Sequence, residues 1–498
     1  MATGCSGAGF ALKWFETLRN VAVTMPVSPT ADKQYYAKCE QTVGALICLG
    51  VKSNDVTVTV SNKIFVDISK MAAPVQDGNT WATAYGNLQT ALTAATTGLE
   101  VWVAKGTYKT TTTTTRTVYF NVPSGVKVYG GFMGTETLLS ERDFKMNPSI
   151  LSGDIGTQNL ETDNSYHVVV FNGSSNTTVL DGFTITGGYA NFDPKREFSA
   201  STSLTTSTIE TGGGIVVQNA GMPMIANCMV VNNSAVSGGG LFASDASMPM
   251  IMFCKFMGNQ AGFGAGMYFQ DGSNGKVSNT LIAGNKGIGG VYNNTSNPMF
   301  TNVTFSGNGG YNGGIFNTNS QPIVKNSIIW GNATPFNDLQ SIITYSTVQA
   351  GYVGVGNLSG DPKFVSQTPE GLAPNITGDY HLQATSLSID RGDNGTISLT
   401  DKDLDGNLRR FAGANVDMGA YEFQGTATAT LIISVQTGPW EANSTWDIGR
   451  VPQLGDNVII NNNHNVTISG TGTAKNVEIR TNAKLIHGSA SSKLQTGL

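Results

Sequence analysis

The stretch Gly212-Gly213-Gly214-Ile215-Val216 decides the fold of this chain, because similar glycine-rich stretches return four more times before residue 332. The later copies are Gly238-Gly239-Gly240-Leu241-Phe242, Gly264-Ala265-Gly266-Met267-Tyr268, Gly289-Gly290-Val291-Tyr292 and Gly313-Gly314-Ile315-Phe316. A second strand-like run follows each copy, and these runs end on Asn233, Asn259, Asn285, Asn308 and Asn332, in steps of 26, 26, 23 and 24 residues. A recurring step of this size is the sequence signature of a repeat architecture.

The length of the repeat favours a parallel β-helix. It is too short for a propeller blade, and it contains no helix-forming stretch. If each unit is one coil, equivalent residues stack about 4.8 Å apart. Glycines then permit positive φ at the corners, and asparagines at the bends hydrogen-bond to one another as ladders. An inward apolar column is expected at Ile215, Leu241, Met267, Val291 and Ile315. We therefore predict an all-β solenoid.

Composition excludes several other classes of protein. Of 498 residues, 61 are glycine, 13% are charged and 40% are hydrophobic, which rules out a coiled coil and a chain disordered by composition. The net charge of −5 argues against a nucleic-acid partner, which needs a basic face. No apolar run approaches the ~20 residues of a membrane span. The first 30 residues lack the pattern of a signal peptide, so we expect that segment to lie outside this chain.

Residues 78–423 resemble the right-handed parallel β-helix proteins of bacterial surfaces, of the pectin-lyase-like type found in long secreted proteins of Bacteroidota. The segments that carry the resemblance include Trp81-Ala82-Thr83-Ala84-Tyr85, Tyr129-Gly130-Gly131-Phe132, Ile150-Leu151-Ser152-Gly153-Asp154, Asp379-Tyr380-His381-Leu382, Ile389-Asp390-Arg391-Gly392-Asp393 and Val416-Asp417-Met418-Gly419-Ala420-Tyr421-Glu422. The resemblance implies a right-handed solenoid in a secreted or cell-surface protein. It implies little about any reaction.

Four regions are expected along the chain. Residues 1–63 resemble the last strands of immunoglobulin-like repeats of bacterial surface proteins, and here Cys5, Cys39 and Cys48 indicate one disulfide plus one unpaired thiol. The β-helix is expected over 64–423, with a capping helix at about 88–95. A linker over 424–430 leads to a β-rich module at 431–498, similar to the start of a second solenoid. The whole is interpreted as a fragment of a longer exported polypeptide.

Two functions follow from this architecture. Multi-module chains of this kind look like adhesins, so we predict binding of polysaccharide or cell-surface glycans through a rigid solenoid. The alternative is a carbohydrate-active enzyme, either a polysaccharide lyase or a glycoside hydrolase. Over 211–332 the only acids are Asp245 and Asp271, and Glu, Arg and His are absent, so this region is poor in the groups that such chemistry needs.

The two acids belong to one column, which comprises Asn219, Asp245, Asp271, Thr295 and Asn319. Stacking places their carboxylates roughly 5 Å apart, the separation used by retaining glycosidases. Three interpretations stay open: a catalytic pair, a Ca²⁺ site shared with the neighbouring asparagines, or a column of turn residues that bond to local backbone.

A second candidate site is the stretch Asp401-Lys402-Asp403-Leu404-Asp405-Gly406. Its D-x-D-x-D-G spacing places three oxygen ligands around Ca²⁺, with Asp417 or Glu422 completing the shell. The twelfth position is Ala412, so this is not an EF-hand. The structural alternative is an ion-pair network of Asp405 with Arg409 and of Asp417 and Glu422.

A third candidate is a sugar-stacking strip, since aromatic faces bind the C–H faces of pyranose rings. The aromatic residues proposed for it are Trp102, Tyr108, Tyr129, Phe132 and Tyr268. Inward core positions are the alternative for these side chains. The Ser/Thr-rich insertion 189–211 is expected to form a loop over one face of the solenoid.

Overall fold

The computed structural model divides the chain into two compact units, Met1–Ile64 and Phe65–Leu498. It describes residues 10–16, 21–23, 33–43, 46–49, 56–58, 62–190, 208–337, 340–395, 397–411, 414–425, 431–447 and 450–496, with only the backbone up to residue 58. The predicted disulfide among Cys5, Cys39 and Cys48, residues 191–207 of the insertion and 426–430 of the linker lie outside the described residues.

The first unit contains an antiparallel sheet of five strands. The strands are β1 (Phe10–Glu16), β2 (Val21–Val23), β3 (Lys33–Val43), β4 (Leu46–Leu49) and β5 (Val56–Val58). The long strand β3 is central and pairs with β1, β4 and β5. The immunoglobulin-like assignment of residues 1–63 stays a prediction.

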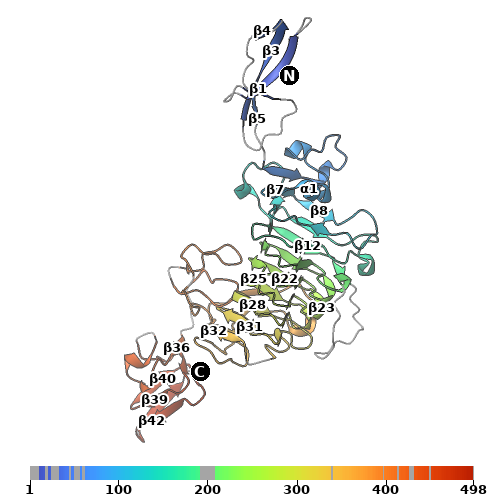
Figure 1. The fold of residues 1–498 in the computed structure, drawn as a ribbon. Coiled ribbons are helices and arrows are strands. Elements are labelled where there is room, and N and C mark those ends of the chain that lie inside the picture. Colours follow the sequence, from blue (N-terminus) through green and yellow to red (C-terminus); the bar gives the residue numbers. More distant parts are fainter. Residues whose placement is uncertain are drawn as a thin grey trace. The chain divides into compact units, whose positions relative to one another are not determined.

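The second unit is built around a parallel β-helix, in which each strand pairs with the strand one coil further along the chain (Figure 1). Its seven-stranded sheet follows this rule throughout, and all its pairings are parallel. The strands are β9 (Phe120–Asn121), β12 (Val169–Asn172), β16 (Ile215–Gln218), β20 (Leu241–Ala243), β24 (Met267–Gln270), β27 (Val291–Asn294) and β29 (Ile315–Thr318).

A 17-stranded sheet holds two adjoining stacks of strands. After β6 (Lys63–Val66), the first stack comprises β7 (Glu100–Ala104), β10 (Lys127–Phe132), β13 (Val179–Asp181), β17 (Met224–Ala226), β21 (Met250–Met252), β30 (Ile323–Lys325) and β32 (Ile342–Thr344). The second stack comprises β8 (Gly106–Lys109), β11 (Ser149–Ser152), β14 (Phe183–Thr186), β18 (Met229–Val231), β22 (Lys255–Met257), β31 (Ile328–Trp330) and β33 (Thr347–Val348). The long strands β25 (Lys276–Ala283) and β28 (Met299–Ser306) belong to both.

A four-stranded sheet completes the coils. It consists of β15 (Tyr189–Ala190), β19 (Ser234–Ser237), β23 (Gln260–Phe263) and β26 (Lys286–Ile288). Residues in the left-handed region form the bends between sheets, and the column from Asn219 to Asn319 has φ values of 50–57°. Asn and Asp tolerate this conformation better than other non-glycine residues, which explains their recurrence there.

The core of the solenoid contains the inward apolar column that the repeats predict. Ile215, Leu241, Met267, Val291 and Ile315 are fully buried, as predicted. The sugar-stacking strip is wrong, because its five aromatic side chains are buried too, between 0% and 9% exposed. Trp102 and Phe132 stack on each other with ring centroids 4.6 Å apart, so these rings stabilise the interior rather than meet a ligand.

The predicted asparagine ladder is present and buried. Each Oδ1 from Asn259 to Asn332 accepts the Nδ2–H of the asparagine one coil earlier at 2.9–3.1 Å, and its backbone N–H at 3.0–3.1 Å. Nδ2 of Asn259 also donates to the carbonyl oxygen of Val230 at 2.8 Å. The side-chain amides thus satisfy backbone groups at a bend where no strand continues.

The expected helix is α1 (Leu88–Ala94), which Asn87 caps by accepting the N–H groups of Gln89 and Thr90. It buries Leu88, Ala91 and Leu92 and lies against β7 and β9 of the first coil. Short 3-10 helices lie at Ile68–Lys70, Trp81–Thr83, Leu139–Glu141, Glu161–Asp163, Thr208–Glu210, Glu370–Leu372 and Asn443–Thr445.

Residues 431–496 form a second, smaller set of parallel strands around Trp440 and Trp446, which are both buried. Its strands are β36 (Leu431–Ile433), β37 (Gly438–Pro439), β38 (Asn457–Ile460), β39 (Asn465–Ile468), β40 (Thr471–Ala474), β41 (Asn476–Ile479), β42 (Lys484–His487) and β43 (Lys493–Thr496). Apart from one isolated antiparallel bridge, the described pairings here are parallel.

Replacing one ladder residue tests its contribution to stability. We expect Asn259→Ala to lower the free energy of unfolding by about 3 kcal/mol, because it leaves buried donors and acceptors of the adjacent coils without a partner. Urea denaturation measures the change, with Asn121→Ala as the control, because Asn121 is the exposed residue of β9 and its loss is expected to stay within about 0.5 kcal/mol of wild type. Equal losses for the two variants would contradict the ladder's role.

Candidate functional site

Residues 364–423, called the covering segment below, run along the outside of the coils. It begins with β34 (Phe364–Ser366) and β35 (Asp379–Leu382), which pair with each other. The N–H of Gly419 donates to the carbonyl of Asn326, and the N–H of Asn375 donates to that of Gly284. Its apolar side chains, among them Tyr380 and Met418, pack with residues of the second strand stack. The segment therefore closes one face of the solenoid and leaves a groove beside it.

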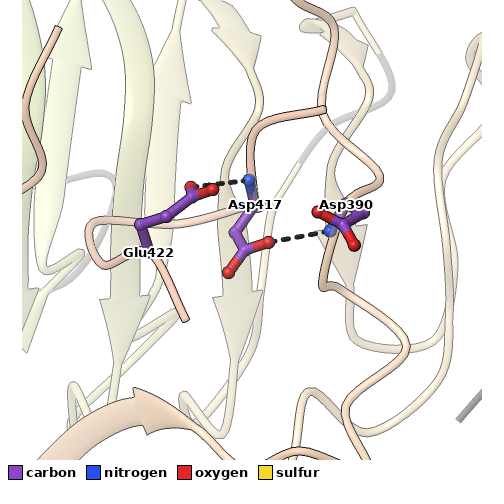
Figure 2. Close-up of side chains that lie close together, drawn as sticks. All are labelled: Asp390, Asp417 and Glu422. Carbon is purple, nitrogen blue, oxygen red and sulfur yellow. Dashed lines mark hydrogen bonds between the residues drawn. The ribbon is translucent and has the colours of Figure 1, made fainter. Parts of the chain in front are cut away.

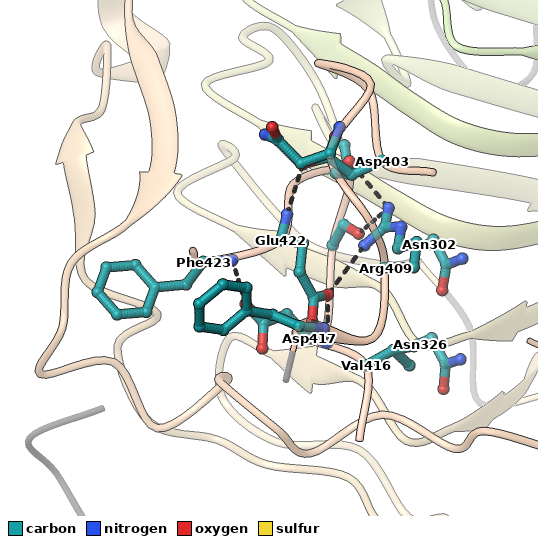
Figure 3. A network of polar contacts seen from close by, with 12 residues as sticks. Asn302, Asn326, Asp403, Arg409, Val416, Asp417, Glu422 and Phe423 are labelled. Atoms are coloured by element: carbon teal, nitrogen blue, oxygen red, sulfur yellow. Dashed lines mark hydrogen bonds and ion pairs between the residues drawn. The ribbon is translucent and has the colours of Figure 1, made fainter. Parts of the chain in front are cut away.

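Arg409 anchors the covering segment from within. Its side chain is fully buried, and its Nε donates to Oδ1 of Asn279 at 2.9 Å while Nη2 donates to the carbonyls of Gly419 and Ala420 at 2.8 Å. Nη1 lies 3.9 Å from Oε2 of Glu422 (Figure 3). A buried guanidinium with these partners holds the segment to the coil and supplies a positive charge to the acids nearby.

Three carboxylates converge next to this arginine. Each of Asp390, Asp417 and Glu422 offers an oxygen within 4.8 Å of the other two (Figure 2). Oδ1 of Asp417 accepts the N–H of Asp390 at 2.7 Å, and Oε2 of Glu422 accepts the N–H of Asp417 at 2.9 Å. Burial raises the pKa of Asp417 to about 7 and that of Glu422 to about 9, and the repulsion between neighbouring carboxylates adds to the effect.

The predicted calcium ligands do not all join this group. Asp417 belongs to it, but Asp401, Asp403 and Asp405 do not. Asp401 accepts the N–H of Ser398, and buried Asp403 accepts the N–H groups of Asp405, Asn407 and Glu422. Asp405 points to His381, not to Arg409, which corrects the expected Asp405–Arg409 ion pair. Arg409 instead lies beside Glu422.

The groove between the covering segment and the coils has a volume of about 440 Å³. Its apolar walls come from Phe183, Met229 and Phe253 of the coils and from Phe144 and Leu404, which face them. The volume lies within the range of roughly 300–1,000 Å³ usual for ligand sites. Ser149, Thr184 and Asn227 also line it, and lysine and aspartate side chains at its edge add charge.

Three charged residues give the groove its polarity. Lys145, Lys255 and Asp405 all line it. Lys255 stands at the start of β22 with its ammonium 5.8 Å from the ring centre of Tyr421, and burial lowers its pKa. Nζ of Lys145 donates to the carbonyl of Asp405 at 3.4 Å. Two ammonium groups thus face one cleft, where they can donate to an oxygen-rich ligand.

His381 holds Asp405 at the edge of the groove. Its Nε2 lies 2.7 Å from Oδ2 of Asp405, and its Nδ1 lies 2.5 Å from Oδ1 of Asp379. Asp379 and His381 are two apart on β35, so their side chains share a face of the strand. The hydrogen bond with Asp405 raises the pKa of His381 and lowers that of Asp405. The pair therefore favours an imidazolium between two carboxylates.

Asp245 and Asp271 lie at exposed corners rather than in this groove. Both have positive φ, at 57° and 54°. Oδ2 of Asp245 accepts from the Ser244 hydroxyl at 3.1 Å, and Oδ2 of Asp271 accepts from Nε2 of Gln270 at 2.7 Å. These local bonds fit the interpretation as turn residues, and their catalytic role stays a prediction.

Sequence reasoning missed Lys255 and His381. The four histidines are scattered along the chain, so nothing in the spacing linked His381 to Asp405, which follows it by 24 residues. One signal was available: Asp379-Tyr380-His381-Leu382 alternates polar and buried residues, which places Asp379 beside His381. Asp390 belongs to the segment Ile389–Asp393 that carries the family resemblance, but nothing in the sequence placed it beside Asp417 and Glu422.

Comparison with known proteins defines the class of the fold. Residues 152–329 match the family model described as "Right handed beta helix region". The solenoid is a right-handed parallel β-helix, which confirms the predicted fold class. A search of curated proteins finds no match to the chain.

Two solved structures are similar to parts of it. The crystal structure of pectate lyase Pel9A shares 13% identity at a TM-score of 0.35, covering 72% of this chain and 96% of that chain. A Family 28 exopolygalacturonase from Yersinia enterocolitica shares 12% identity at a TM-score of 0.14, covering 95% of this chain and 83% of that chain. Likenesses at these levels bear on neither activity nor substrate. Among the described residues, no helix is long and apolar enough to cross a membrane.

The raised pKa values of Asp417 and Glu422 predict a stability that falls as pH rises. The folded state retains protons that the unfolded state loses near pH 4, so the stabilisation is complete below that pH and is lost through pH 7 to 9. In EDTA, we expect the free energy of unfolding to fall progressively between pH 5 and pH 9, by several kcal/mol. Urea midpoints across this range measure the drop.

A neutral replacement checks the source of that slope. Glu422→Gln keeps an oxygen for the N–H of Asp417 but removes an ionisable group, so the decline should be clearly shallower than in wild type. The exposed Glu161→Gln serves as the control and should keep the wild-type slope. An unchanged slope in Glu422→Gln would show that the buried carboxylates do not cause it.

Proposed function

We propose that this chain is a glycan-binding part of an exported, adhesin-like protein, and that the groove beside the covering segment receives the glycan. The observation that carries the proposal is the composition of the groove, where the lysines Lys145 and Lys255 and the carboxylate Asp405 line a cleft with aromatic walls. A pyranose presents apolar C–H faces together with hydroxyl or carboxylate oxygens. Aromatic walls suit the former, and ammonium and carboxylate groups suit the latter.

The surroundings of the groove support binding through a fixed surface. Arg409 and the apolar contacts of the covering segment hold one wall to the coils, and the ladder holds the coils to one another. A wall held in place loses little conformational freedom when a ligand arrives, so more of the contact energy remains as affinity. The export of the protein is part of the proposal and rests on the resemblance of its segments to bacterial surface proteins.

Retention on immobilised polysaccharides tests the proposal. We expect Lys255→Met to weaken retention at least about tenfold, the effect of losing one charge-assisted hydrogen bond. Lys286→Met is the matched control, since Lys286 is exposed on β26 and does not line the groove. Loss of retention in both variants would indicate general charge attraction. Retention unchanged in Lys255→Met would reject this groove as the site.

A carbohydrate-active enzyme is the second candidate, and one observation favours it. Burial lowers the pKa of Lys255 within a cleft that also holds the Asp405 carboxylate, and groups with shifted pKa values in clefts are candidates for proton transfer. Release of unsaturated or reducing-end product from the same polysaccharides would establish catalysis. Loss of product in Lys255→Met would place it in the groove, whereas loss in Asp271→Ala alone would place it at the corner column.

We also propose a Ca²⁺ site at the three clustered acids, of which Asp417 and Glu422 are buried and Asp390 is exposed. Asp390, Asp417 and Glu422 bring three carboxylates within reach of one cation, and oxygen ligands are what Ca²⁺ prefers. At ten times its dissociation constant, Ca²⁺ should stabilise the fold by about 1.4 kcal/mol, and Glu422→Gln should lose the effect. Thermal unfolding with Ca²⁺, Mg²⁺ and EDTA measures it. Equal unfolding temperatures in all three would reject the site.

A further inference from the structure

Two adjacent coils carry the same unusual tripeptide on their outer face. Met222-Pro223-Met224 and Met248-Pro249-Met250 are 26 residues apart, which is one coil. Met224 pairs with Met250 between β17 and β21, and the N–H of Met250 donates to the carbonyl of Pro223 at 2.9 Å. The N–H of Met248 donates to the carbonyl of Gly221, so the two tripeptides lie in register along their whole length.

The register brings four thioethers to one place. Prolines 223 and 249 are buried, so by strand alternation the methionines on either side of each point outward. Their backbones are separated by about 4.8 Å between coils and by roughly 6.7 Å along each strand. A methionine side chain has three rotatable bonds beyond its backbone and can span such gaps. All four methionines line one pocket of about 210 Å³.

We propose that this methionine pocket binds a soft monovalent metal ion, Cu(I) or Ag(I), through its thioether sulfurs. Thioethers are soft ligands that select Cu(I) over the hard cations held by carboxylates. The remaining lining, Asn176, Pro249, Asn274 and Lys276, contains no carboxylate, imidazole or thiolate, so it offers a hard cation only two neutral amide oxygens. The site is separate from the groove proposed for glycans, with no residue in common.

Apolar character alone does not account for these methionines. The same outward column continues through Met299 to Ile323 and Ile342, where branched aliphatic side chains occupy the equivalent exposed positions. Four of the chain's 15 methionines nevertheless gather in this pocket. Met248 and Met250 are 50% and 38% exposed, so their sulfurs are accessible to an ion from solvent.

Lys276 is the one charged group in the lining, and it opposes a cation. It pairs with Met250 of the preceding coil, and it is exposed, so its ammonium can turn to solvent. A monovalent ion meets half the repulsion that a divalent ion would meet. Lys276→Gln should therefore tighten binding by a fewfold, an effect that simple apolar packing would not produce.

Methyl NMR of the full chain with ¹³C-labelled methionine methyl groups tests the proposal. Because only methionine methyl groups are observed, binding of the metal to cysteine thiols gives no signal of its own. On titration with Ag(I), which needs no reductant, we expect the resonances of the four pocket methionines to shift together once the accessible thiols have taken up their share of the ion. Leucine replacements assign them and serve as the functional test, because leucine keeps the volume and apolar character but lacks sulfur. Met248→Leu should weaken Ag(I) binding at least tenfold, and Met222→Leu combined with Met248→Leu should abolish it.

Met299→Leu is the matched control, since Met299 is about as exposed as Met250, at 40%, and lies outside both the pocket and the glycan groove. This variant should bind Ag(I) as the wild type does. Equal shifts of Met299 and the pocket methionines would show unspecific thioether binding and overturn the proposal. So would an Ag(I) affinity that the pocket leucine variants leave unchanged. Neither outcome bears on the proposed glycan binding, which is tested with variants of Lys255 and Lys286.

Discussion

Hydrogen bonds that run along the axis of the solenoid, from each coil to the next, are the constraint on which the rest of the structure depends. Strands meet this constraint by parallel pairing, and several bends do so as well, but the backbone N–H of a ladder asparagine bonds to a side chain instead. The buried asparagines solve the problem with their side chains, since the amide of Asn259 pairs with those of Asn233 and Asn285 much as one peptide group pairs with another. Within the ladder each asparagine therefore relies on the next one, whereas at its two ends backbone groups take over: Asn233 accepts the N–H of Gly188, and Asn332 donates to the carbonyl of Phe305.

This dependence explains why the fold could be predicted from the sequence. A ladder imposes the same residue type at the same place in every coil, so the regular spacing from Asn233 to Asn332 was enough to predict it. The same spacing predicted the inward column from Ile215 to Ile315. Position within the coil also explains why aspartates occur at positions 245 and 271. Their column shares a positive φ, and a carboxylate there is one of several side chains that suit the bend.

The groove could not be predicted in this way, because the segments that form its walls do not share the spacing of the repeats. Phe144, Lys255 and Asp405 meet only when the covering segment lies against the coils. The stretch from Asp401 to Asp405 shows how far spacing can mislead. Asp403 is buried and bonds to backbone N–H groups, while Asp405, two residues later, faces the groove and His381. Ligand spacing predicts a metal loop only if all the side chains turn to one centre.

The direction of the inter-coil hydrogen bonds also determines how the solenoid responds to force. Tension applied along its axis acts in line with these bonds and loads them one row at a time, so the end coil peels away while the others stay intact. Strand pairs pulled across their bonds share the load over many rows at once. Each coil of about 24 residues that peels away adds roughly 80 Å of chain. A protein of this design in tension between two surfaces would lengthen in steps and re-form as the load falls, because each coil needs only its neighbour to fold against.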